Sequence, residues 1–114
     1  MHVKKIEAII RPAKVGTVCE ALDKLGHPGL MVTEVEGHGH QKGLEQQFRG
    51  KTYKVEFMTK ARIQIVVNDS DVDKTIDAIC AAAVTGQVGD GKIFVYPVED
   101  AVRIRTGERG AMAV

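Results

Sequence analysis

Two kinds of hydrophobic spacing alternate along this chain, and their order restricts the fold more than any other feature. Apolar side chains recur at every second position in "KKIEAII" and "ARIQIVV", which is typical of strands with one buried face. They recur at helical spacing in two longer stretches. The predicted strands are 3–10, 30–37, 61–67 and 92–98, and the predicted helices are 13–26 and 69–86. The order β-α-β-β-α-β predicts a ferredoxin-like α+β domain, with a four-stranded antiparallel sheet and two helices on one face.

The apolar positions also predict which side of each element is buried. The predicted core positions are Ile6, Ala8 and Ile10, then Ile63, Ile65 and Val67, then the helical stripes Val15, Val18, Leu22 and Leu25 and Val72, Ile76, Ile79 and Ala83. Gly26 and Gly86 are expected to end the two helices, because glycine is common just past a helix C-terminus. The acidic run at 69–71 suits the start of the second helix.

The opposite face of the predicted sheet has a different character. It would carry Lys5, Glu7, Ile9, Arg62, Gln64, Val66, Phe94 and Tyr96. This mixture is too apolar for water and too polar for the core of a single chain. It therefore predicts burial against further copies of the same chain.

Composition narrows the class of protein. A chain of 114 residues predicts one domain, and its net charge of +1 disfavours duplex DNA or an anionic membrane as a partner. Neither a signal peptide nor an apolar span of membrane length is evident, so we expect a cytoplasmic protein. Cys19 and Cys80 lack CxxC spacing and lie in helical patterns, which predicts buried or half-buried reduced thiols. The stretch from about 38 to 54 lacks apolar periodicity and predicts a long exposed loop or flexible hairpin.

The segment "TGQVGDGKIF" contains most of a phosphate-binding motif. Gly86, four residues, Gly91 and Lys92 match a Walker A loop, but Ile93 stands where serine or threonine would hold Mg²⁺. A helix precedes this loop and a strand follows it, the reverse of a P-loop NTPase. The glycines can still turn backbone N–H groups toward an anion.

Basic residues further along the chain extend this prediction. Arg103 and Arg105 would share one face of an extended segment and suit a polyphosphate, since side chains alternate along a strand. The alternative interpretation is a glycine turn with solvated basic side chains.

The segments "TGQVGDGKIFV" and "RIRTGE" resemble the two signatures of the PII nitrogen-regulatory proteins, and "KKIEAIIRP", "VTEVEGHGHQKG" and "FRGKTYKVEF" extend the resemblance over nearly the whole chain. It implies a homotrimer that binds ATP or ADP between subunits, and 2-oxoglutarate together with Mg-ATP. It implies one domain over 1–114, with a T-loop at about 38–54, a B-loop at about 84–92 and a C-loop at about 103–110.

The resemblance also implies partners. The T-loop would dock onto an ammonium transporter and onto nitrogen-metabolism enzymes or regulators. The protein would be a regulator with at most slow ATP turnover, would bind no nucleic acid, and would reach a membrane only through a bound transporter.

Residue roles follow from the same resemblance, position by position. The nucleotide-binding set is Gly37, His40, Gln41, Gln64, Gly89, Asp90, Gly91, Lys92, Arg103 and Arg105. The 2-oxoglutarate-binding set is Arg11, Gly39, Gln41, Lys42, Gly43, Lys60 and Gly89. Gln41 would complete the Mg²⁺ site, Tyr53 matches a tyrosine that a uridylyltransferase modifies in some bacteria, and Arg49 matches an arginine that enters an ammonium channel.

Three positions depart from the family pattern, and two other function classes remain open. His40 replaces a usual Arg, Gln64 a usual Glu and Met31 a usual Thr, which puts nucleotide preference in question. An RRM-like RNA-binding module would share the topology, although the near-neutral charge opposes it. A PII-like sensor of another small metabolite is the second alternative. A nucleotide hydrolase is disfavoured, because no nucleophile, base or carboxylate pair is placed for catalysis.

Overall fold

The predicted order of elements is confirmed. The computed structural model describes residues 1–27, 29–48 and 51–114, and for 37–58 it describes the backbone alone. The strands are β1 (Val3–Ile10), β2 (Leu30–Phe48), β3 (Lys51–Asn68) and β4 (Gly91–Pro97), and the helices are α1 (Val15–Lys24) and α2 (Val72–Ala83). Within these ranges no helix is long and apolar enough to cross a membrane.

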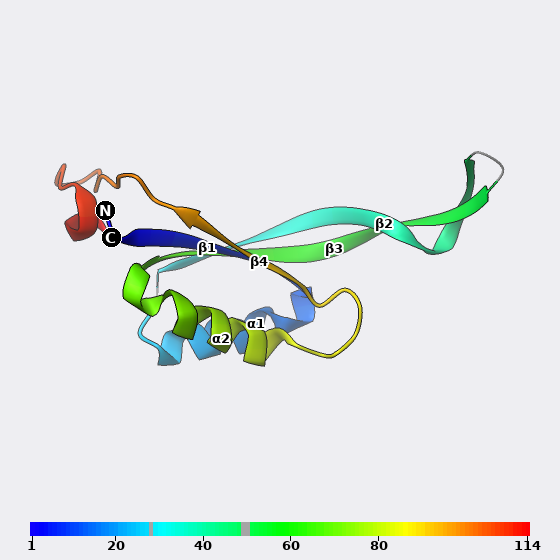
Figure 1. Cartoon of the computed structure of the whole chain (residues 1–114), viewed down its shortest axis with the longest axis horizontal. Coiled ribbons are helices and arrows are strands. Elements are labelled where there is room, and N and C mark those ends of the chain that lie inside the picture. Colours follow the sequence, from blue (N-terminus) through cyan, green and yellow to red (C-terminus); the bar gives the residue numbers. More distant parts are fainter. Residues whose placement is uncertain (28, 49–50) are drawn as a thin grey trace.

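The four strands form one antiparallel sheet in the order β2-β3-β1-β4, and α1 and α2 lie side by side on one of its faces (Figure 1). β1 pairs with β3 from Val3 opposite Asn68 to Ile10 opposite Ala61. β4 is an edge strand and ends at Pro97, as expected for a residue without a backbone donor. The fold class predicted from the sequence is therefore correct.

The core lies between the sheet and the two helices. The predicted strand positions are buried, with Ile6, Ala8 and Ile63 fully inaccessible. Val18 and Leu22 of α1 and Ile79 and Ala83 of α2 close the core from the other side, and the outer stripe positions Val15, Val72 and Ile76 pack at its margin. The pattern missed Thr75, which is fully buried. Its hydroxyl donates to the Asp71 carbonyl at 2.6 Å and lies 3.2 Å from His27 Nε2.

The C-terminal ends of α1 and α2 differ in backbone conformation. Gly26 follows α1 with φ +82°, the left-handed conformation expected after a helix. Gly86 does not end α2, because the helix stops at Ala83 and Val84 is already extended, with φ −69° and ψ 136°. The prediction for Gly86 was therefore wrong by three positions, and this glycine, with φ +87°, belongs to the loop that follows.

The outer parts of β2 and β3 form an arm, defined here as residues 36–48 and 51–59. They pair with each other out to Phe48 opposite Lys51, with a shift of register between His40 and Leu44. Figure 1 shows the arm projecting from the sheet, and the molecule is 58 Å long in its largest dimension. Of the two structures expected for 38–54, a hairpin matches this paired backbone better than a loop. The sequence pattern did not indicate strands here, because the hydrogen bonds between paired strands need no apolar alternation.

Two further expectations need correction. Cys19 is half-buried and free, as expected, but the free Cys80 is exposed, because it lies beside the buried stripe of α2 rather than in it. The segment after β4 is not extended. Val102 pairs with Arg109 across a turn, and a 3-10 helix follows at Gly110–Ala113.

Candidate functional site

The loop between α2 and β4, residues 84–90, is the glycine loop of the predicted phosphate site, and Gly91 follows it at the start of β4. Gly89 and Gly91 have φ angles of +103° and +112°, which side-chain-bearing residues rarely adopt. A Cβ on Gly91 would lie 1.7 Å from the carbonyl oxygen of Ile9 in the neighbouring strand. Glycine is therefore required at 91, both by its conformation and by the approach of β1.

The carboxylate of Asp90 points back into this loop. Its Oδ2 accepts from the backbone N–H groups of Thr85 at 2.8 Å and Gly86 at 2.9 Å. Its Oδ1 accepts from the Thr85 hydroxyl and from Arg11 Nε, the latter at 3.1 Å. The Thr85 hydroxyl is the largest of the causes that hold the pKa of Asp90 well below its ordinary value. Asp90 is therefore ionised, and its charge faces donors of the protein.

Two cationic side chains, one just after β1 and one in β3, donate hydrogen bonds to the tip of the loop. Arg11, just after β1, donates through Nη2 to the Val88 carbonyl at 2.9 Å. Lys60 of β3 donates to the Gly89 carbonyl at 2.5 Å. Thus three residues of the predicted 2-oxoglutarate set, Arg11, Lys60 and Gly89, lie together, and both cations bind loop carbonyls.

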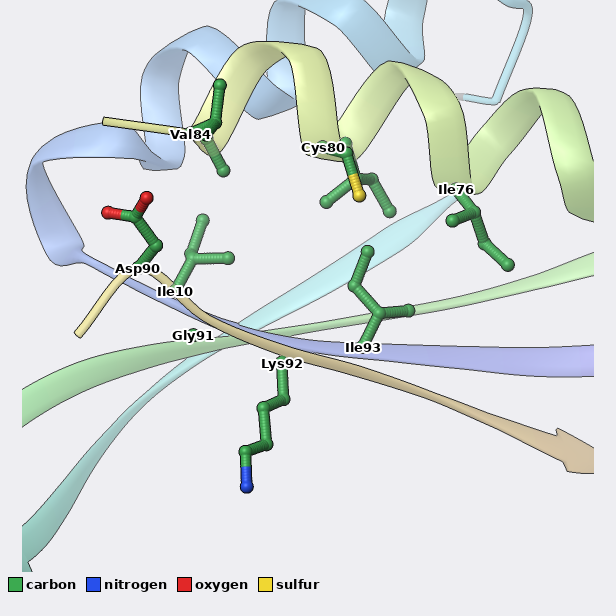
Figure 2. A pocket seen from close by; sticks show the side chains of 10 residues that line it. Ile10, Ile76, Cys80, Val84, Asp90, Gly91, Lys92 and Ile93 are labelled. Atoms are coloured by element: carbon green, nitrogen blue, oxygen red, sulfur yellow. The ribbon is translucent and has the colours of Figure 1, made fainter. Parts of the chain in front are cut away.

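A hollow of about 330 Å³ adjoins this cluster on the sheet face opposite the helices. Its lining is Ile9, Lys60, Gly89, Gly91, Lys92 and Phe94. A second hollow, of about 270 Å³ and mainly apolar, lies between α2 and β4 on the helix side, and the exposed Cys80 borders it (Figure 2). Figure 2 shows the Lys92 side chain pointing away from this second hollow, toward the opposite face. Lys92 thus adds positive charge beside Lys60 and the glycine turn.

The open sheet face carries the predicted mixture of side chains. Gln64 lies opposite Met31 in β2 and Glu7 in β1, so two of the three positions that depart from the family pattern are direct neighbours. Lys5 lies over the ring of Tyr96, 4.8 Å from its centre. The Nε of Arg62 is buried and has no hydrogen-bond partner within the described part of the chain. A buried donor of this kind is costly unless an acceptor comes from elsewhere.

The C-terminal arginines have different surroundings from those expected. Because the chain turns after Arg103, its guanidinium reaches Glu108 at 3.1 Å and the Met112 carbonyl at 3.1 Å. Arg105 is exposed. The prediction that both arginines share the face of an extended segment is therefore wrong. Arg109, which the sequence did not single out, pairs with Asp100 and is the main cause of a lowered pKa of that carboxyl.

The glycine loop and the C-terminal arginines lie at opposite ends of β1. The loop packs on Ile9 and Ile10, whereas the segment after β4 lies near Met1 and Val3. In Figure 1 the yellow loop and the red C-terminal turn are correspondingly far apart. An eight-residue strand spans roughly 25 Å. One chain therefore cannot bring both groups onto the same phosphates.

The remaining predicted site residues lie in or near the arm. Only the backbone is described for seven of them: Gly37, Gly39, His40, Gln41, Lys42, Gly43 and Tyr53. Arg49 lies outside the described residues. Sequence reasoning missed Thr85 and Glu108, which pair with Asp90 and Arg103. Both lie five residues from their partners, and that spacing across a glycine turn was the available signal.

Comparison with known proteins gives one consistent family. The family model described as "Nitrogen regulatory protein P-II" matches residues 3–108. A relative named "Nitrogen regulatory protein P-II" from Rhodospirillum rubrum is 53% identical over 112 residues, covering 98% of this chain and 100% of the relative. "Nitrogen regulatory protein P-II 2" of Methanothermobacter thermautotrophicus is 49% identical over 114 residues, covering 100% of this chain and 99% of the relative.

Solved structures are similar over the same length. The structure described as B. subtilis GlnK has a TM-score of 0.85 and 35% identity, with full coverage of both chains. The structure described as Arabidopsis thaliana PII bound to citrate has a TM-score of 0.81 and 41% identity, covering 99% of this chain and 92% of that one.

Proposed function

The chain belongs to the nitrogen regulatory protein P-II family, and on that premise we propose that it is a cytoplasmic regulator that senses adenine nucleotides and 2-oxoglutarate. ATP or ADP binds at sites shared between the subunits of a homotrimer, and 2-oxoglutarate binds together with Mg-ATP. The arm carries the ligand state to a target such as an ammonium transporter or a nitrogen-metabolism enzyme. The relatives are named as regulatory proteins, which supports regulation rather than catalysis.

The single observation that carries the shared site is the separation of its two halves. Lys92 and the glycine turn lie at one end of β1, and Arg103 and Arg105 follow β4 near its other end. A polyphosphate that uses both groups must take them from two copies of the chain. Arg103 uses one guanidinium nitrogen on Glu108 and another on the Met112 carbonyl, so a carboxylate competes with the nucleotide for part of this guanidinium.

The open sheet face supports assembly. Phe94 and Tyr96 of β4 are 45% and 40% exposed, and the buried Nε of Arg62 has no acceptor among the described residues. A neighbouring copy that covers this face buries the aromatic rings and can supply the acceptor. Three copies arranged in a ring repeat one heterologous contact three times. In the proposed trimer, each contact places the glycine loop of one copy against the C-terminal arginines of the next.

The Arg11 and Lys60 cluster supports a carboxylate ligand. Both cations bind loop carbonyls, and a dicarboxylate can replace those neutral acceptors with charged ones. The citrate-bound structural relative shows that a PII protein takes up a small polycarboxylate. For 2-oxoglutarate beside ATP, Mg²⁺ held by phosphates and Gln41 would offset the repulsion between the two anions.

The shared site is tested by complementation between two inactive variants. Lys92→Met and Arg103→Met are each expected to weaken ADP binding in calorimetry by about tenfold or more, through loss of a charge-assisted contact. Mixed trimers, refolded together, should recover about one tight site in three, because one interface then pairs an intact loop with an intact arginine. Arg109→Met is the matched control, since it removes a neighbouring arginine that binds Asp100.

Several outcomes would contradict the proposal. A monomer in light scattering, or mixed samples that bind no better than either variant, would exclude the shared site. Titrations of 2-oxoglutarate with ATP, with ADP and without Mg²⁺ test the second ligand, with citrate as the comparison. Equal binding in all three conditions would exclude coupling through Mg-ATP, and preference for citrate would identify a sensor of a different carboxylate.

A further inference from the structure

We infer that Asp90 is a positioning residue, whose carboxylate fixes the shape of the glycine loop and makes no contact with nucleotide or metal ion. Its consequence for binding rests on the proposed function. The resemblance placed Asp90 among the nucleotide-binding residues, beside Gly89 and Gly91. Its side chain has a different task from its neighbours.

The first reason is that the acceptor sites of the carboxylate are already used. A carboxylate offers about four lone-pair positions. Asp90 accepts four hydrogen bonds, two at each oxygen, from the Thr85 N–H, the Thr85 hydroxyl, the Gly86 N–H and Arg11 Nε. No acceptor position is left for a ribose hydroxyl or for Mg²⁺. A direct role would require some of these bonds to break.

The second reason is which segments of the chain the four hydrogen bonds connect. Thr85 and Gly86 lie at the start of the loop, two and three residues after α2 ends, and Asp90 ends the loop directly before β4. Three of the bonds therefore close the loop on itself, between residues four or five positions apart. The fourth bond attaches it to Arg11, 79 residues away, at the end of β1. The same guanidinium also donates to the Val88 carbonyl, so loop and sheet are held at two points.

The third reason is electrostatic. An unpaired carboxylate in this loop would repel a polyphosphate. Here Arg11 lies against the carboxylate, and Lys60 and Lys92 lie in the same region, so the positive charge of the lysines stays available to an anion. Asp90 thus arranges the glycine backbone for an anionic ligand without presenting its own charge to that ligand.

The experiment compares four variants of the full-length protein in ADP titrations with and without Mg²⁺. Asp90→Asn, which loses the charge and at least one acceptor position, should weaken ADP binding about tenfold, by the same factor in both conditions. Thr85→Val should weaken it in the same direction, and Thr85→Ser, which keeps the hydroxyl, should restore it. Asp69→Asn, the control, removes a carboxylate that pairs with Lys4 at the far end of β1, and should leave binding unchanged.

A second measurement is independent of nucleotide binding. The amide protons of Thr85 and Gly86 donate to Asp90, so their hydrogen-exchange protection should fall at least tenfold in Asp90→Asn and stay unchanged in Asp69→Asn. If the wild type binds no ADP, the proposed function fails, and this exchange measurement still decides the positioning role.

Three results would overturn the inference. The first is an effect of Asp90→Asn on affinity that occurs only with Mg²⁺, which would identify a metal ligand. The second is wild-type affinity in both Asp90→Asn and Thr85→Val. The third is unchanged protection of the two amides. If Asp90→Asn does not fold, Thr85→Val and Thr85→Ser carry the comparison.

Discussion

Replacing Gly91 by alanine adds one methyl group where β4 begins, against the backbone of β1. The new Cβ would lie 1.7 Å from the Ile9 oxygen and 2.8 Å from the Ile9 carbonyl carbon, so the strands would have to separate by roughly 1 Å or more. The φ of +112° costs about 1–3 kcal/mol more for alanine than for glycine. Together these effects should lower the free energy of unfolding by about 3 kcal/mol or more.

The assay is urea unfolding at one fixed protein concentration, because the stability of an oligomer depends on concentration. Gly16→Ala is the matched control. Gly16 is exposed within α1, and nothing lies within 4 Å of the position of its added Cβ. The same chemical change should therefore raise the free energy of unfolding by about 0.5–1 kcal/mol. Equal effects of the two substitutions, or a stable Gly91→Ala protein, would refute this reasoning.

Leu22→Ala empties a fully buried core position and should cost about 2–5 kcal/mol, with a smaller loss in urea unfolding excluding the described packing. Thr75→Val should cost about 1 kcal/mol because two partners lose their hydrogen bond, and Thr75→Ser, which keeps the hydroxyl, separates this effect from packing. Lys4 holds the pKa of Asp69 below its ordinary value of 3.8, so this carboxylate stabilises the fold above that pH and the effect is lost as pH falls through the lowered value. Asp69→Asn should therefore be less stable than wild type at about pH 7, and the difference in stability should shrink as the pH falls below 3.8. A difference independent of pH would contradict the role of the charge.

The order of elements could be predicted because the spacing of the apolar residues indicates which side chains are buried. Ile63, Ile65 and Val67 alternate with polar neighbours, and only a strand with one buried face satisfies that spacing. The arm is different. Its backbone groups are satisfied by pairing with each other, which requires no apolar alternation, so the sequence left loop and hairpin as alternatives.

For the candidate site, the sequence indicated which residues to consider but not which contacts they make. Arg11 and Asp90 are 79 residues apart, and nothing in the sequence states that they meet. For Arg103, the alternation argument assumed an extended backbone. The turn at Gly107, with φ +74°, brings Glu108 back to the guanidinium instead. In both cases the type of residue indicated charge recognition, whereas the three-dimensional path of the chain determined what each charge binds.

If the arm contacts the target, as proposed above, partner choice and the fold can be inherited separately. β1 pairs with β3 only as far as Ala61, so residues 51–59 of β3 have no strand neighbour other than β2. The buried residues of β3 described above, Ile63, Ile65 and Val67, lie beyond this stretch. Under that proposal, selection for a new target would change residues of the arm, while selection for folding would act on the sheet and the glycine loop. Gene duplicates of such a chain should diverge first in the arm and last around Gly91.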